Sequence, residues 1–164
     1  MGADVSVHEG VMNSELPFQT ARVVLSPGGQ PLLGVPATLA GVSVFVAEDE
    51  PMLVWALEEV LSDFGCRVVG TAARVAEALA FVADHAFDVA ILDGKLADGS
   101  VDPVLDVLIA RGTPFIIASG VASTDLTTKY AGAVVLQKPY KDADLRQALR
   151  LALARELVEP KSIT

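Results

Sequence analysis

Short apolar runs alternate with segments of helical periodicity along most of the chain after residue 41. The runs are rich in Val, Ile and Leu and read as buried strands. They cover residues 42–47, 67–70, 88–93, 114–118 and 133–136. Between them, apolar residues recur every three or four positions, which predicts helices. The predicted core-facing positions of these helices are Leu53, Leu57, Val60 and Phe64; Val75, Leu79 and Val82; Val104, Leu105 and Leu108; and Leu145, Leu149 and Leu153.

This alternation predicts the fold class. Strands that alternate with helices form a parallel sheet with right-handed crossovers. Continuous apolar strands indicate that helices cover both faces of that sheet. We therefore expect an α/β, doubly wound, five-stranded parallel sheet.

The chain divides by composition into three parts. Residues 1–41 hold four of the nine prolines and the turn signal Pro27-Gly28-Gly29, and they show little periodicity. We expect an irregular, flexible N-terminal extension over 1–41, a folded domain over 42–157 and a C-terminal tail over 158–164.

Charge and composition exclude several classes of protein. With 12 Lys and Arg against 21 Asp and Glu, the net charge of −9 disfavours binding to nucleic acid. No run of 18 uncharged apolar residues predicts a membrane span, and the N-terminus lacks the pattern of a secretory signal. The single cysteine, Cys66, excludes an intrachain disulfide. A cytoplasmic protein is expected.

Polar side chains follow four of the predicted strands. In a doubly wound sheet, the carboxyl ends of the strands meet at the edge where ligands bind. Glu48 and Asp49 follow the first strand, Asp93 ends the third, Ser119 follows the fourth and Lys138 follows the fifth. We therefore expect these five side chains to converge.

This set of residues suits the transfer of a phosphoryl group to an aspartate. Close carboxylates repel one another unless a cation lies between them, and oxygen ligands favour a hard ion such as Mg²⁺. An ionised carboxylate can attack phosphorus. Lysine and serine can supply charge and a hydrogen bond to the phosphoryl oxygens.

The motifs that carry these residues resemble those of the receiver domain of bacterial response regulators. They read Val-Ala-Glu48-Asp49-Glu50-Pro51, Val-Ala-Ile-Leu-Asp93, Ile-Ile-Ala-Ser119-Gly120 and Leu-Gln-Lys138-Pro139-Tyr140. The resemblance implies a flavodoxin-like (CheY-like) strand order of 2-1-3-4-5. It also implies a cis bond between Lys138 and Pro139.

The resemblance further implies a role for each site residue. Asp93 would be the phosphoacceptor. Mg²⁺ would be held by Asp49, Asp93 and the backbone carbonyl of Lys95, with Glu48 acting through water. Ser119 and Lys138 would contact the phosphoryl group.

The resemblance also implies partners. Phosphate would come from a sensor histidine kinase or a histidine phosphotransfer protein. Only Glu156 to Thr164 follow the last predicted helix, so a stand-alone receiver that signals through protein partners is expected. The stretch around Pro114-Phe115 and Ser119-Gly120 resembles the stand-alone subgroup with a Pro-Phe-x-Phe-Ala-Thr-Gly motif, which is linked to stress signalling.

The usual aromatic switch position of receivers corresponds here to Val135. Conformational change is therefore expected to concentrate in residues 120–132, where helix signals are weak.

Three alternative functions compete with that of a receiver. A phosphorylation-independent protein-interaction module stays open, although Asp93 and Lys138 are both present. An enzyme of the haloacid dehalogenase type, which also uses an aspartate nucleophile, would need an acid at the position of Lys95. A dinucleotide-binding enzyme would need a glycine-rich loop after the first strand, where this chain has acids.

One surface feature predicts the partner contact. At 100° per residue, Trp55 lies about 200° from Leu53, on the outer side of the first helix, and Met52 shares that region. Exposed tryptophan is favoured at the centres of interfaces. We expect Trp55 and Met52 to contact the kinase or phosphotransfer protein; the alternative is that residues 1–41 fold back over Trp55.

Overall fold

The computed structural model describes residues 38–120, 130 and 133–156. The strands of the main sheet are β1 (Ser43–Ala47), β2 (Arg67–Ala72), β3 (Val89–Asp93), β6 (Phe115–Ser119) and β7 (Val134–Gln137). A small hairpin is formed by β4 (Lys95–Leu96) and β5 (Gly99–Ser100). The helices are α1 (Pro51–Asp63), α2 (Val75–Asp84), α3 (Asp102–Arg111) and α5 (Asp142–Glu156).

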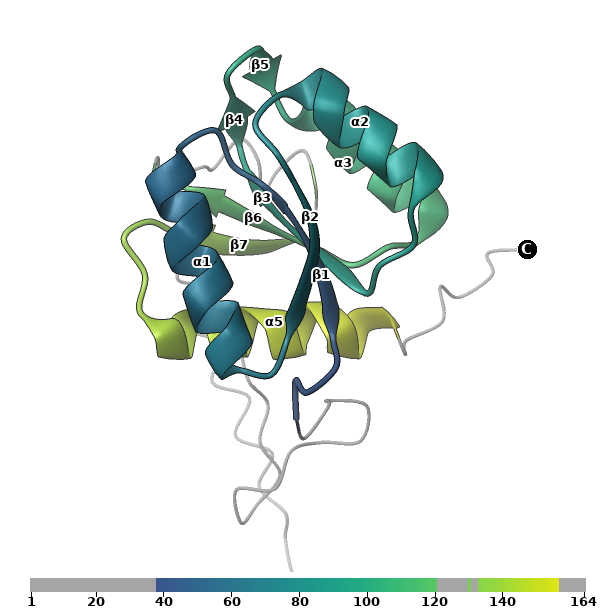
Figure 1. Ribbon diagram of the computed structural model, residues 1–164. Coiled ribbons are helices and arrows are strands. Elements are labelled where there is room, and N and C mark those ends of the chain that lie inside the picture. Colours follow the sequence, from purple (N-terminus) through teal and green to yellow (C-terminus); the bar gives the residue numbers. More distant parts are fainter. Residues whose placement is uncertain (1–37, 121–129, 131–132, 157–164) are drawn as a thin grey trace, which may run out of the picture.

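The five main strands form one parallel sheet in the order β2-β1-β3-β6-β7. Because β6 and β7 are the fourth and fifth strands of this sheet, the predicted order 2-1-3-4-5 is confirmed. Figure 1 shows α1 and α5 on one face of the sheet and α2 and α3 on the other. The predicted doubly wound α/β fold is therefore confirmed.

Alternate residues of each strand supply two separate cores. Val44 and Val46 of β1 pack in the cluster that includes Leu57 of α1 and Leu149 of α5. Phe45, between them, packs in the second cluster with residues of α2 and α3. A strand covered on both faces must be apolar at every position, which explains the continuous apolar runs in the sequence.

The predicted core face of α1 needs one correction. Leu57 and Leu61 are buried, and Val60 and Phe64 pack against the same cluster. Leu53 was expected in the core but is 37% exposed. It lies in the first turn of α1, where it lines a surface cavity between α1 and the start of α5 and does not join the buried cluster.

The hairpin β4–β5 was not predicted: the residues after the third strand include the turn-forming pair Asp98-Gly99 and give no strand signal. Lys95 pairs with Ser100 and Leu96 with Gly99. The side chain of Leu96 is 1% exposed and lies in the cluster formed with α2 and α3. Gly99 has a φ of 138°, which side chains other than hydrogen rarely tolerate. This short hairpin follows Asp93 directly.

The predicted domain boundaries stay predictions. Residues 1–37, the segment 121–129 with 131–132, and the tail 158–164 lie outside the described residues. The last residues of the predicted extension are described: Leu39 is 3% exposed and belongs to the cluster beneath α1 and α5. Among the described residues, no helix is long and apolar enough to cross a membrane.

Candidate phosphoryl-transfer site

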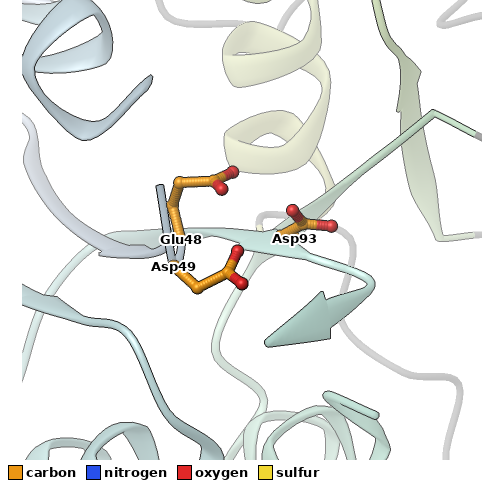
Figure 2. Close-up of side chains that lie close together, drawn as sticks. All are labelled: Glu48, Asp49 and Asp93. Carbon is orange, nitrogen blue, oxygen red and sulfur yellow. The ribbon is translucent and has the colours of Figure 1, made fainter. Parts of the chain in front are cut away.

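Three carboxylates gather at the carboxyl edge of the sheet. Adjacent strands β1 and β3 run parallel in register, so the residues after Ala47 and Leu92 meet at the same edge. Glu48, Asp49 and Asp93 each offer an oxygen atom, and these atoms all lie within 4.8 Å of one another. Figure 2 shows the three side chains close together. The expected convergence of the acids is therefore present.

Lys138 joins this cluster from the end of β7. Its Nζ donates to Glu48 Oε2 at 2.9 Å and to Asp93 Oδ2 at 3.1 Å. Burial lowers the pKa of Lys138, but its hydrogen bonds and charge interactions with the two carboxylates outweigh this, so its pKa is raised. The ammonium therefore stays charged at neutral pH. The bond between Lys138 and Pro139 is cis, as the resemblance implied.

Glu48 is the most deeply buried of the three acids, with 4% of its side chain exposed. Burial raises its pKa, against the lowering effect of the hydrogen bonds from Lys138 and from the Glu50 amide. Desolvation therefore affects the pKa of Glu48 more strongly than the ammonium of Lys138 does. A site made of three close carboxylates, all offering oxygen, fits a hard divalent cation such as Mg²⁺.

The raised pKa of Glu48 predicts a pH dependence of stability. In metal-free buffer the folded state holds the Glu48 proton more tightly than the unfolded state. The contribution of Glu48 to stability therefore falls as the pH rises from the unfolded pKa through the raised folded pKa. Glu48→Gln removes this titration, so its melting temperature relative to the unmodified chain should rise between acidic and neutral pH. A difference that stays constant with pH, measured by thermal melts in EDTA, would contradict this assignment.

Ser119 and Lys95 lie on elements next to the cluster. Ser119 ends β6, is 9% exposed and pairs with Gln137 of β7. Its carbonyl accepts a hydrogen bond from the Lys138 amide at 2.8 Å, which ties the two strand ends together. The Lys95 amide donates to Asp93 Oδ1 at 3.3 Å, so the backbone of Lys95 lies against the Asp93 side chain.

Trp55 and Met52 do not join the cluster. Both project from α1 into solvent, with 59% and 73% of their surface exposed. A cavity of about 450 Å³, which neither residue lines, runs from Glu48, Asp93 and Lys138 to the space between α1 and α5. Its apolar wall is formed by Leu53, Ala56, Leu57, Val60, Tyr140 and Leu145, among others. Apolar surface is thus exposed directly beside the charged site.

Two residues of this region were missed by sequence reasoning. Tyr140 lines the cavity, and burial raises the pKa of its hydroxyl. Its position directly after Lys138-Pro139 was a usable signal. Asp98 has the signature of a turn residue in the sequence, but its carboxylate accepts hydrogen bonds from the first amides of α2. No local pattern signals that contact, because the partners are 23 and 22 residues apart.

The fold and this site define a class of protein. Residues 44–150 match the family model of the response regulator receiver domain, so the chain belongs to that family. This is the signalling domain on which two-component systems are built.

Individual relatives agree with the family. The chain is 32% identical over 117 residues to the transcriptional regulatory protein PdtaR of Mycobacterium tuberculosis, covering 68% of this chain and 57% of PdtaR. It thus spans little more than half the length of this curated relative. The solution structure of SdrG from Sphingomonas melonis Fr1 is similar with a TM-score of 0.61 and 37% identity, over 69% of this chain and 97% of SdrG. The response regulator PhyR from Brucella abortus has a TM-score of 0.64 and 26% identity, over 73% of this chain and 50% of PhyR.

Proposed function

We propose that this protein is a response regulator that accepts a phosphoryl group on Asp93 in a Mg²⁺-dependent reaction and signals through protein partners. The observation that carries the proposal is the position of Lys138, whose ammonium bonds to both Glu48 and Asp93 at the edge of the sheet. A structural ion pair requires one acid, whereas Lys138 bonds to two acids of a cluster of three.

The proposed reaction transfers the phosphoryl group from a phosphohistidine to Asp93. An oxygen of the Asp93 carboxylate forms a bond to phosphorus while the bond between phosphorus and the histidine nitrogen breaks. The nitrogen keeps that electron pair and the imidazole leaves. Lys138 stabilises negative charge on the phosphoryl oxygens, and Ser119, at the end of the neighbouring strand, is the proposed hydrogen-bond donor to them.

Mg²⁺ fits the donor set, and the residues proposed to hold it are Asp49, Asp93 and the Lys95 carbonyl, with Glu48 acting through water. When bound, the ion supplies positive charge that offsets the charge of the carboxylates and of the incoming phosphoryl group. The ion would also oppose the effect of burial on Glu48, whose pKa is raised in its absence.

The decisive test of this function is phosphorylation by a small donor. Acetyl phosphate or phosphoramidate with Mg²⁺ should add one phosphoryl group, seen by intact-mass spectrometry, and EDTA should prevent the addition. A chain that gains no phosphoryl mass at saturating donor and Mg²⁺ would contradict the proposal. In that case the phosphorylation-independent interaction module would become the better interpretation.

The proposed phosphodonor is a sensor histidine kinase or a histidine phosphotransfer protein that docks on α1. Two observations support this surface: Trp55 and Met52 are exposed on α1, and the apolar cavity opens between α1 and α5 beside Asp93. A partner that covers both would bury a tryptophan and bring its histidine to the acceptor. Tryptophan side chains are among those that contribute most to interface affinity.

Trp55→Ala should therefore slow phosphotransfer from the partner about tenfold or more, while the rate with acetyl phosphate stays unchanged. Ile109→Ala is the matched control, because Ile109 is 51% exposed on α3, over the other face of the sheet. Loss of both rates together in Trp55→Ala would assign the side chain to the fold. Partner transfer that does not change at all would support coverage of Trp55 by residues 1–41.

A further inference from the structure

Asp98 makes an unusual contact between two loops. It lies at the tip of the β4–β5 hairpin, and its Oδ1 accepts a hydrogen bond from the Val75 amide at 2.6 Å. Its Oδ2 accepts a second one from the Ala76 amide at 3.3 Å. These are the first two residues of α2. Asp98 thus caps a helix that does not contain it.

The local sequence of α2 leaves this role open. The first amides of a helix have no partner within the helix and need an acceptor from elsewhere. Arg74, at the N-cap position, makes no side-chain cap. Glu77 accepts from the amide of Ala73, before the helix, at 3.0 Å. The hydrogen bonds from the Val75 amide and, to a smaller extent, the Ala76 amide lower the pKa of Asp98, so its carboxylate is ionised at neutral pH.

The turn that Asp98 binds is also bonded to the candidate site. On one side, the Glu48 amide donates to the Ala72 carbonyl at 2.9 Å. On the other side, the Ala97 amide donates to the Ala73 carbonyl at 3.2 Å. Residues 72–76 therefore bridge the loop that carries Glu48 and Asp49 and the hairpin that follows Asp93.

The hairpin in turn positions the backbone beside the acceptor. The Lys95 amide donates to Asp93 Oδ1 at 3.3 Å, and Gly94 is bonded to β6 through the Ala118 carbonyl at 3.2 Å. The Lys95 carbonyl belongs to the same short strand as Leu96, whose buried side chain anchors the hairpin to the core. Asp98 lies in the turn of the hairpin, at the end away from Asp93, and its carboxylate contacts α2 there.

We infer that Asp98 is a positioning residue for the metal and phosphoryl site, which holds the β4–β5 hairpin against α2 so that the backbone at Lys95 keeps its place beside Asp93. This inference rests on the proposed function. Asp98 does not touch the reacting atoms; it acts through the hairpin. Because Leu96 anchors the hairpin independently, loss of Asp98 should loosen the site without unfolding the domain.

The test is the Mg²⁺ affinity of the full chain, measured by calorimetric titration for Asp98→Ala and Asp98→Asn. Asp98→Ala should raise the Kd for Mg²⁺ about tenfold, which is the lower end of the range for substitutions of residues that orient a metal ligand. Its phosphorylation by acetyl phosphate should be slow at limiting Mg²⁺ and recover at saturating Mg²⁺. Asp98→Asn keeps an acceptor for the α2 amides and should stay within about twofold of the unmodified chain.

Asp88→Ala is the matched control for stability. Asp88 Oδ2 accepts two hydrogen bonds from Ser43, at 2.8 and 2.9 Å, at the opposite edge of the sheet. This variant should lower the melting temperature and leave the Kd for Mg²⁺ unchanged.

Three outcomes would overturn the inference. One is an unchanged Kd in Asp98→Ala, and another is an equal rise in Asp88→Ala, which would indicate general destabilisation. The third is an equal rise in Asp98→Asn, which would indicate an effect of charge. If the unmodified chain itself neither binds Mg²⁺ nor gains a phosphoryl group, the proposed function fails and this inference fails with it. In the first three cases only the inference fails.

Discussion

Asp93→Asn should abolish phosphorylation and leave the fold intact. The substitution keeps the shape of the side chain but removes the carboxylate oxygen that attacks phosphorus, so the expected loss is complete within detection. The protein is incubated with acetyl phosphate and saturating Mg²⁺, and its intact mass is recorded over time. Asparagine can still accept a hydrogen bond from Lys138, which in the unmodified chain donates to Asp93 Oδ2 at 3.1 Å. The melting temperature should therefore change little.

Asp49→Asn is the control that separates the acceptor from a metal ligand. It removes one carboxylate of the same cluster, so it should weaken Mg²⁺ binding and slow phosphorylation at limiting Mg²⁺. Higher Mg²⁺ should restore much of that rate, whereas no Mg²⁺ concentration should restore Asp93→Asn. An Asp93→Asn variant that still gains a phosphoryl group would assign the acceptor to another residue.

Lys138→Met should slow phosphorylation of Asp93 about a hundredfold, the loss typical of removing one preorganised group that stabilises developing charge. Methionine keeps the length of the aliphatic chain but cannot donate to Glu48 or to the phosphoryl oxygens. The same change leaves Glu48, 4% exposed, without its ammonium partner, so the free energy of unfolding should fall by about 1–2 kcal/mol at neutral pH. The expected loss of unfolding free energy is small for an ion pair with a buried acid, because the Lys138 side chain is 24% exposed.

Two variants control for the loss of a lysine. Lys141→Met removes a positive charge three positions further along the same loop and should leave the rate near normal. Lys138→Arg keeps the charge and should recover part of the rate. If Lys138→Met is phosphorylated as fast as Lys141→Met, Lys138 has only a structural role.

The approximate positions of the site residues follow from sequence patterns alone. Five apolar runs alternating with helical periodicity require a parallel sheet covered on both faces, and the residues after each run must then meet at one edge. This argument places Glu48, Asp49, Asp93 and Lys138 together although they are far apart in the chain. It needs no side-chain geometry, because the parallel arrangement itself brings the strand ends together.

The contacts between these residues could not be predicted in the same way. Lys138 bonds to Glu48 and Asp93. This choice of partners depends on how deeply each side chain is buried at the edge of the sheet. Sequence shows which residue types are near the edge but not how far each is buried. The deep burial of Glu48, which raises its pKa, is therefore a result of the tertiary structure.

The sequence by itself thus determined the fold class and the residues at the edge of the sheet through its hydrophobic pattern. It determined the strand order through the resemblance of its motifs to a known family. Packing between elements decided the rest. Leu53 follows the helical spacing of buried residues, yet it lines a cavity between α1 and the start of α5 and stays outside the buried cluster that Leu57 joins. Asp98 has the signature of a turn, yet it caps α2, because the hairpin brings it to amides that lie 22 and 23 residues earlier in the chain. Periodicity reports which side of one element is apolar, whereas cavities and contacts between loops arise only when separate elements meet.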